Sequence, residues 1–145
     1  MKGTSKQMKI ILNKKYGGFG ASYEAYKLYA DKKGLPLYLY SGNFCLNKYR
    51  KVNELTTDSN FRIYTTEDNG DQFDNNKKID GELNLDESMR TDKTFIEVVK
   101  ELGSKANDRF SNLVIVTIPN KSHYIIDECD GFETLYYSSS EIKTK

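Results

Sequence analysis

The last third of the chain holds three strand-like segments joined by very short connections. Residues 113–118 form the most apolar run in the sequence, and residues 123–128 and 132–137 follow it closely. Because parallel neighbours need a crossover of roughly a dozen residues, these segments cannot be joined as parallel strands. The Asp130-Gly131 pair supplies the positive φ angles that a tight hairpin turn requires. This spacing argues against a doubly wound parallel sheet and predicts a C-terminal antiparallel hairpin.

The first part of the chain predicts a strand followed by a helix. Residues 8–13 are apolar and rich in β-branched side chains, which is typical of a buried strand. A glycine-rich stretch follows, and apolar residues then recur at helical spacing from Ala25. Ser22 is the expected N-cap of this helix, and Gly34 marks its end.

The middle of the chain is less regular, and order returns near residue 90. Residues 35–40 and 61–64 read as two strands that pair with each other. Asp92 is the expected cap of a second helix that Gly103 ends. No period is evident over residues 41–59. Together these elements predict an α+β fold, a mixed β-sheet with about two helices on one face.

Length and charge bear on the domain organisation. A chain of 145 residues fits one domain, which we expect over residues 8–137, with a disordered start at 1–7 and a polar tail at 138–145. The net charge of +1 conceals +9 over residues 1–51 and −6 over residues 65–92. Residues 65–87 look too polar to pack, so we expect a long, mobile acidic loop there.

The cysteine content and the hydropathy indicate a cytoplasmic protein. Cys45 and Cys129 are the only cysteines and form no CxxC pair, so a disulfide framework and a structural zinc site are not expected. No secretory signal is evident, and no apolar run approaches the ~20 residues of a membrane span. A homo-oligomer is compatible with the sequence.

The residues available for catalysis are few. His123 is the only histidine, so the chain offers no cluster of imidazole ligands and no redundant His relay. The acidic residues gather in the 65–87 segment, where carboxylates are solvated. The sequence therefore leans against an enzyme and predicts neither a metal site nor a cofactor.

The glycine-rich stretch is the strongest candidate for binding. A strand ending at Asn13 leads through two lysines and the glycines into the helix, which places free backbone N–H groups and a positive helix end beside two ammonium groups. Such a cradle could hold a phosphate or carboxylate. Neither G-x-G-x-x-G nor the P-loop pattern is present, so a simple tight turn is the alternative. The candidate ligand-binding residues are Asn13, Lys14, Lys15, Tyr16, Gly17, Gly18, Phe19, Ser22, Arg90 and Arg109.

Two of these candidates lie outside the glycine stretch. Arg90 stands at a helix start, where its guanidinium could fork onto a phosphate or pair with Asp92. Arg109 lies in a loop. Among the aromatic side chains, we expect Tyr16, Phe19 and Phe132 to lie nearest any ligand.

The chain resembles a family of small, uncharacterised proteins encoded by tailed phages and large DNA viruses. The matching segments are residues 9–20 with Ser22 and Ala25, Arg90-Thr91-Asp92, 95–103, Ala106-Asn107, 114–116, Ile118-Pro119, 124–128 and 130–133. The chain departs from the family pattern at Ala21, Lys93 and Cys129. The resemblance implies a viral origin and this fold, and it lends no established activity.

These observations give one preferred function and two alternatives. The preferred one is a non-enzymatic viral accessory protein that sequesters an anionic, nucleotide-like ligand, such as a nucleotide signal of host defence, in the host cytoplasm. The first alternative is a protein-interaction module that inhibits a host factor through the acidic 65–87 loop. The second is nucleic-acid binding through the basic first third, which the acidic loop disfavours.

Overall fold

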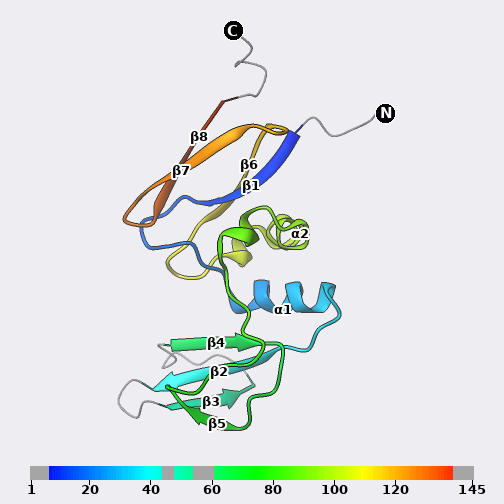
Figure 1. The fold of residues 1–145 in the computed structure, drawn as a ribbon, viewed down its shortest axis with the longest axis vertical. Coiled ribbons are helices and arrows are strands. Elements are labelled where there is room, and N and C mark those ends of the chain that lie inside the picture. The colour runs from blue at the N-terminus through cyan, green and yellow to red at the C-terminus, as the bar shows by residue number, and fades with distance from the viewer. Residues whose placement is uncertain (1–6, 44–47, 54–60, 139–145) are drawn as a thin grey trace. The chain divides into compact units, whose positions relative to one another are not determined.

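The computed structural model describes residues 7–43, 48–53 and 61–138, and within these ranges the fold is α+β, as predicted (Figure 1). The helices are α1 (Tyr23–Lys32) and α2 (Lys93–Leu102), with short 3-10 helices η1 (Glu87–Arg90) and η2 (Gly103–Ala106). The strands are β1 (Gln7–Asn13), β2 (Tyr38–Asn43), β3 (Lys48–Val52), β4 (Phe61–Thr65), β5 (Gln72–Asp74), β6 (Leu113–Pro119), β7 (His123–Cys129) and β8 (Phe132–Ser138).

The chain divides into two compact units, where the sequence suggested one domain over residues 8–137. Unit 1 comprises Met1–Ala25 and Leu85–Lys145, and unit 2 comprises Tyr26–Asn84. Unit 2 is therefore an insertion within the sequence of unit 1. Apolar periodicity identifies strands and helices, but it does not show which of them share a core, and this is why the division was not foreseen.

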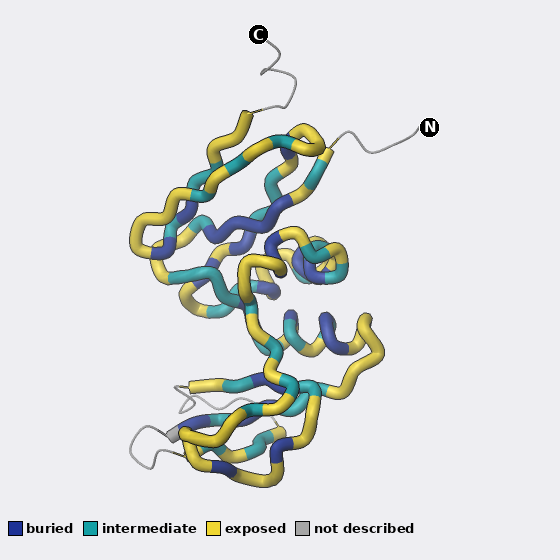
Figure 2. The backbone as a smooth tube through the Cα atoms, in the orientation of Figure 1, coloured by how far each residue is buried: buried dark blue, intermediate teal, exposed yellow. Residues whose placement is uncertain are grey.

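Unit 1 is built from two antiparallel strand pairs. β1 pairs with β6 from Gln7 opposite Pro119 to Asn13 opposite Leu113. β7 pairs with β8 through the predicted turn, in which Asp130 and Gly131 both have positive φ. One face of the β1–β6 pair packs against the inward face of the hairpin and buries apolar side chains. The buried stretch of the β1 backbone is coloured dark blue in Figure 2. The residues in this contact are Met8, Ile10, Leu12, Val114, Val116, Ile118, Tyr124, Ile126 and Leu135.

Helix α2 begins and ends where the sequence predicts. The Asp92 carboxylate accepts a hydrogen bond from Phe95 N at 2.9 Å, and Gly103 follows the last residue with a φ of 58°. Phe95, Val98 and Val99 are buried, and the helix contacts both β1 and β6. Neither helix in the described ranges is long and apolar enough to cross a membrane.

Unit 2 is a four-stranded antiparallel sheet in the order β4-β2-β3-β5. The predicted pairing of residues 61–64 with the strand ending at Tyr40 is confirmed. Strand β3 lies in the stretch where the sequence shows no period. Helix α1 contacts the sheet through Tyr26, whose ring stacks on Tyr64 with centroids 3.8 Å apart.

The acidic segment 65–87 is packed, which corrects the expectation that it is too polar to do so. It contains β5, whose Phe73 is buried, and it buries Asn69. The Asn69 amide group donates to Glu67 O and Asp80 O, and its oxygen accepts from Asp80 N at 3.0 Å. Hydrogen bonds from one side chain to the backbone organise this segment, and hydropathy does not reveal such bonds.

The terminal segments are only partly described. Residues 1–6 and 139–145 lie outside the described residues, so the predicted disorder of the start and the tail stays a prediction there. Gln7 and Ser138, which we expected to lie in the disordered start and the polar tail, belong to strands instead, since β1 begins at Gln7 and β8 ends at Ser138.

An ion pair in unit 2 gives a testable pH dependence. Lys51 Nζ lies 2.7 Å from Asp68 Oδ1, and this hydrogen bond, with a further one from Gly70 N, holds the pKa of Asp68 below its ordinary value of 3.8. The ion pair therefore contributes its full stabilisation of the fold above pH 3.8. This contribution is lost as the pH falls through the lower pKa that Asp68 has in the folded state. An NMR titration of the Asp68 carboxyl should show this lowered pKa. Lys51→Met should move it back towards 3.8, whereas Lys78→Met should leave it in place; equal shifts in both variants would contradict the assignment.

Candidate functional site

Asn13, at the end of β1, holds three loops of unit 1 together. Its side chain is fully buried. Its amide nitrogen donates to Lys15 O at 2.8 Å and to Gly131 O at 2.7 Å. Its amide oxygen accepts from Asn112 N at 2.8 Å. Both donor hydrogens and the acceptor are therefore used within the chain, so Asn13 positions the loops and has no donor left for a ligand.

The glycine stretch packs tightly against two of these loops. Gly17 N donates to Asp130 O at 2.8 Å, and Gly18 N donates to Phe110 O at 3.2 Å. The approach to the hairpin turn is so close that a Cβ added to Gly131 would lie 2.5 Å from Gly17 C. Two backbone donors of the expected cradle are thus bonded to carbonyl oxygens of the chain. At these two positions the geometry favours the tight-turn alternative.

Arg90 forms a buried ion pair with Glu133 of β8. Its Nη1 and Nη2 donate to the two carboxylate oxygens of Glu133 at 2.8 and 2.7 Å, and the exposed fractions of the two side chains are 7% and 4%. Nη1 also donates to Ile11 O at 3.0 Å, and Nε donates to Glu87 Oε2 at 2.9 Å. Burial alone would lower the pKa of Arg90, but the hydrogen bonds to Glu133 and Glu87 outweigh it and raise the pKa above its ordinary value.

This pair resolves the alternatives that the sequence left open for Arg90. The guanidinium forks onto a carboxylate, as an arginine at this place can, but the carboxylate belongs to Glu133. Asp92 caps α2 instead of pairing with Arg90. Phe19 lies against the guanidinium, whose carbon is 4.2 Å from the ring centroid. Arg90 and Phe19 therefore belong to the interior contacts of unit 1.

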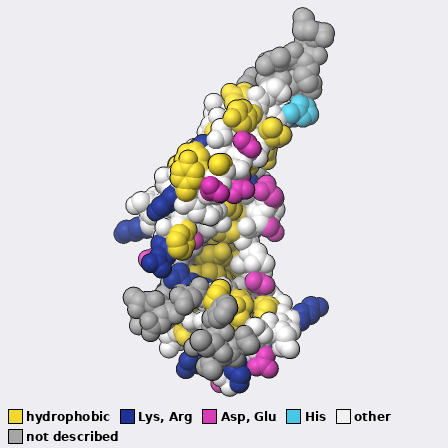
Figure 3. All heavy atoms as spheres, turned by 90° about the vertical axis from the view of Figure 1, so that its left-hand side faces the viewer, with side chains coloured by type: hydrophobic (Ala, Val, Ile, Leu, Met, Phe, Trp, Pro, Cys, Tyr) yellow, Lys and Arg dark blue, Asp and Glu magenta, His cyan; other side chains and the backbone are white. Residues whose placement is uncertain are grey.

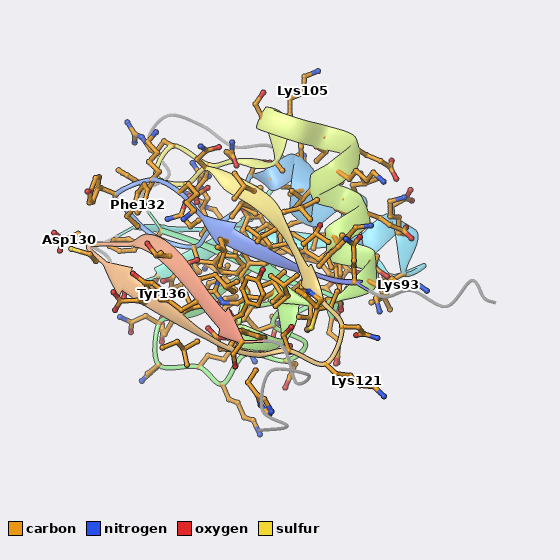
Figure 4. The ribbon with its side chains drawn as sticks, turned by 90° about the horizontal axis from the view of Figure 1, so that it is seen from above. Lys93, Lys105, Lys121, Asp130, Phe132 and Tyr136 are labelled. Atoms are coloured by element: carbon orange, nitrogen blue, oxygen red, sulfur yellow. The ribbon has the colours of Figure 1, made fainter. Side chains whose placement is uncertain are left out.

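Cationic and aromatic side chains gather where the glycine stretch meets the hairpin turn. Lys14 Nζ donates to Glu133 O at 2.5 Å and lies 5.1 Å from the centroid of Phe132. The Phe132 ring packs against Tyr16 with centroids 5.2 Å apart. In Figure 4, the labelled residues Asp130 and Phe132 mark this end of unit 1, on the side opposite Lys93.

The 107–112 loop adds a second cation and a second ring. Arg109 lies over the ring of Phe110 with 5.4 Å to the centroid, and its carbonyl oxygen accepts from Lys15 Nζ at 3.1 Å. Tyr16 and Phe110 are 67% and 58% exposed. We call the surface formed by Lys14, Lys15, Tyr16, Arg109, Phe110 and Phe132 the tip surface. Apolar and Lys or Arg side chains lie next to one another on the face of unit 1 seen in Figure 3.

The remaining predicted residue, Ser22, has a structural role. Its hydroxyl oxygen accepts from Ala25 N at 3.1 Å, which confirms Ser22 as the N-cap of α1. The same hydroxyl donates to Lys105 O at 2.6 Å. Of the predicted residues, the structure thus brings Lys14, Lys15, Tyr16 and Arg109 together at the surface.

Sequence reasoning missed Glu133 and Phe110. Glu133 stands at an inward position of β8, in step with Leu135, which contacts the core. A carboxylate at an apolar position of an alternating strand is a signal for a buried partner, and it could have been found. Phe110 gave no such signal, because its exposure depends on the loop conformation.

A hollow beside the Arg90–Glu133 ion pair is less suited to an anion than the tip surface is. Its volume is about 430 Å³, and it is lined by Glu87, Glu128 and Glu133 together with Arg90 and β7 residues. Its carboxylates outnumber its one cation, so a phosphate would meet repulsion there. No group of three His, Cys, Asp or Glu residues in the described ranges could hold a metal ion.

Comparisons with protein-family models, with curated proteins and with solved structures find no match to this chain.

Proposed function

We propose that the chain binds a nucleotide-like anion at the tip surface of unit 1 without converting it chemically. The observation that carries this proposal is the placement of two exposed rings, Tyr16 and Phe110, beside the cations Lys15 and Arg109. An aromatic ring stacks on any nucleobase and contributes roughly 1–3 kcal/mol per base, and neighbouring cations attract the phosphate.

The local charge favours a ligand with a base over a bare anion. Lys14, Lys15 and Arg109 contribute three positive charges, and Asp108 and Asp130 of the same loops contribute two negative ones. The Asp108 carboxylate lies close to Gly20, where a free phosphate would be repelled. A ligand that gains stacking as well as ionic contacts therefore fits this surface better than inorganic phosphate.

The proposed biological role rests on the resemblance to virus-encoded proteins, which itself lends no established activity. A protein of that origin that binds a nucleotide and does not convert it would act by sequestration. We therefore extend the proposal to a nucleotide signal of host defence, bound in the host cytoplasm. A mass spectrum of the small molecules released from the denatured protein would identify a ligand carried through purification.

Tyr16→Ala and Lys15→Ala are expected to weaken ligand binding. Tyr16→Ala removes a stacking surface, so its dissociation constant should rise by about 5- to 150-fold, which corresponds to 1–3 kcal/mol. Calorimetric titration with cyclic nucleotides and ADP-ribose derivatives measures this change. Lys93→Ala is the matched control, because Lys93 is exposed on the opposite side of unit 1 (Figure 4). Absence of binding at millimolar ligand, or equal weakening by Lys93→Ala, would contradict the proposal.

The acidic segment of unit 2 supports a second candidate function. Its carboxylate residues are exposed, although the segment itself is packed, so they form a negative surface that could bind a basic host protein. The exposed acids of this segment that belong to unit 2 are Glu67, Asp68, Asp71, Asp74, Asp80 and Glu82. The Tyr16→Ala variant separates the two candidate functions, because a partner bound through the acidic segment should bind this variant with unchanged affinity.

A further inference from the structure

Strand β7 forms one edge of the hairpin, and part of its backbone has no partner. The two-residue turn at Asp130-Gly131 makes Cys129 and Phe132 a hydrogen-bonded pair, and along the ladder such pairs alternate with pairs that are not hydrogen-bonded. Tyr124 and Ile126 belong to the second kind, so their backbone N–H and C=O groups point away from β8. In the described ranges no strand other than β8 pairs with β7, and no described residue bonds to these groups.

Side chains close the neighbouring edges of unit 1. On β1, Ile11 O accepts from Arg90 Nη1 at 3.0 Å. Asn13 N of the same strand donates to Glu133 Oε1 at 2.8 Å. On β8, Glu133 O accepts from Lys14 Nζ. These side chains take the places where a further strand would bind, which is a common way to protect a sheet edge. Within the part of the chain that the structure describes, β7 has no such cover at the two residues named above.

A hollow of about 430 Å³ borders this edge. It is lined by Tyr124, Ile125 and Ile126 of β7 and by the two ends of η1, Glu87 and Arg90. Its volume falls within the range of roughly 300–1,000 Å³ that is typical of ligand sites. The residues with unpaired backbone groups therefore border a space that is large enough for a ligand.

The hollow carries an excess of negative charge. Arg90 neutralises Glu133, which leaves the exposed residues Glu87 and Glu128 in excess. Glu87 Oε2 accepts from Arg90 Nε at 2.9 Å. Glu128 Oε2 accepts from Gly131 N at 2.7 Å. The second oxygen of each of these two carboxylates has no partner among the described residues. A cation entering the hollow would thus find two acceptors.

We propose that the β7 edge binds an extended basic peptide segment of another protein by strand addition. The backbone of the segment pairs with Tyr124 and Ile126, as main-chain groups do when a peptide extends a sheet. Side chains on one face of a strand recur at every second residue. Lys or Arg at such positions of the segment reach Glu87 and Glu128.

The same two features of the edge argue against other occupants. A nucleic-acid strand or an acidic peptide would bring negative charge to Glu87 and Glu128. A second copy of β7 would do so as well, because its own charged residues include Asp127 and Glu128 and no Lys or Arg. A polyamine would satisfy the carboxylates but leave the backbone groups of the edge unpaired. A basic peptide satisfies both.

Binding of a seven-residue peptide in which lysine alternates with threonine tests the proposal on the full chain. NMR should show slower amide exchange of Tyr124 and Ile126 in the complex, because the strand would cover this edge. Glu87→Gln with Glu128→Gln keeps the hydrogen-bond acceptors and removes the charge. This double variant should raise the dissociation constant about 2- to 30-fold, as expected for the loss of two exposed charge pairs.

Matched controls separate strand addition from simple charge attraction. Asp71→Asn with Asp74→Asn removes the same charge from exposed positions of unit 2 and should leave the affinity unchanged. Methylating the peptide's backbone nitrogens at alternate residues should abolish binding for the set that faces β7 and not for the other set. The Tyr16→Ala variant, altered at the tip surface, should bind the peptide normally.

Each other outcome would overturn the proposal. These outcomes are absence of binding at millimolar peptide, binding without slower exchange of the two amides, and equal weakening by both double variants. Equal binding of the two methylated peptides would show that the peptide backbone does not pair with β7. A dimer of the chain that the peptide dissociates would assign the edge to a second copy, and a mass measurement in solution detects it.

Discussion

Replacing Glu133 with alanine is expected to destabilise unit 1 by about 3–5 kcal/mol, which is the usual cost of removing one partner from a buried ion pair. The Arg90 guanidinium would lose two hydrogen bonds in an environment with little water, since its side chain is only 7% exposed. Asn13 N, which donates to Glu133 Oε1 at 2.8 Å, would lose its acceptor as well. Urea unfolding, followed by hydrogen exchange of the β1 amides, measures the loss within unit 1.

Glu87→Ala is the matched control for this prediction. Glu87 binds the same guanidinium, but its side chain is 82% exposed, so its removal should cost at most about 1 kcal/mol. Replacing Arg90 with Met and Glu133 with Leu together should recover only part of the loss, because Ile11 O and Asn13 N would remain without their partners. Equal effects of Glu87→Ala and Glu133→Ala would refute the assigned importance of the buried pair.

Gly131→Ala is expected to have the second large effect, through the contact between the hairpin turn and the glycine stretch. Gly131 has a φ of 91°, and an added Cβ would lie 2.5 Å from Gly17 C and 2.6 Å from Gly18 N. These neighbours are backbone atoms, so the loops must move apart. Overpacking typically costs about 1–3 kcal/mol beyond the backbone strain, and the tip surface should lose its arrangement.

The Gly103→Ala variant separates the effect of backbone strain from the effect of the collision with neighbouring backbone atoms. Gly103 also lies in unit 1 with a positive φ of 58°, but nothing stands within 4 Å of its added Cβ. It should show backbone strain of roughly 1–3 kcal/mol without a collision. Thermal unfolding compares the two variants, and NMR shifts of Tyr16 and Phe132 should change only in Gly131→Ala. If both glycine variants left the tip signals in place, the close approach would not be what positions this surface.

Local signals made much of the fold of unit 1 predictable. Asp92 and Gly103 bound α2 because a capping carboxylate and a glycine act within one helical turn. Asp130-Gly131 makes the hairpin turn for an equally local reason, the positive φ of both residues. Strand β5 was missed because a single buried residue, Phe73, holds it in place among polar neighbours.

The candidate site was predictable only in part, since it depends on contacts between distant segments. Lys14, Lys15 and Tyr16 were expected to act with the backbone donors of the glycine stretch. Instead, two of those donors bind carbonyl oxygens more than 90 positions away, at Phe110 and Asp130. Composition reveals that a lysine is present, but only the fold shows that Arg109 and Phe110 stand beside it.

The insertion of unit 2 within unit 1 has a consequence for the order in which the chain folds as it leaves the ribosome. Unit 2 is continuous in sequence, so it can form as soon as Asn84 has emerged. β1 is made first, yet its partner β6 begins only at Leu113, and the Glu133 that accepts from Asn13 comes later still. At a synthesis rate of roughly 5–20 residues per second, β1 remains without its partner strand for several seconds. During that time the apolar residues of β1 have no partner strand to cover them.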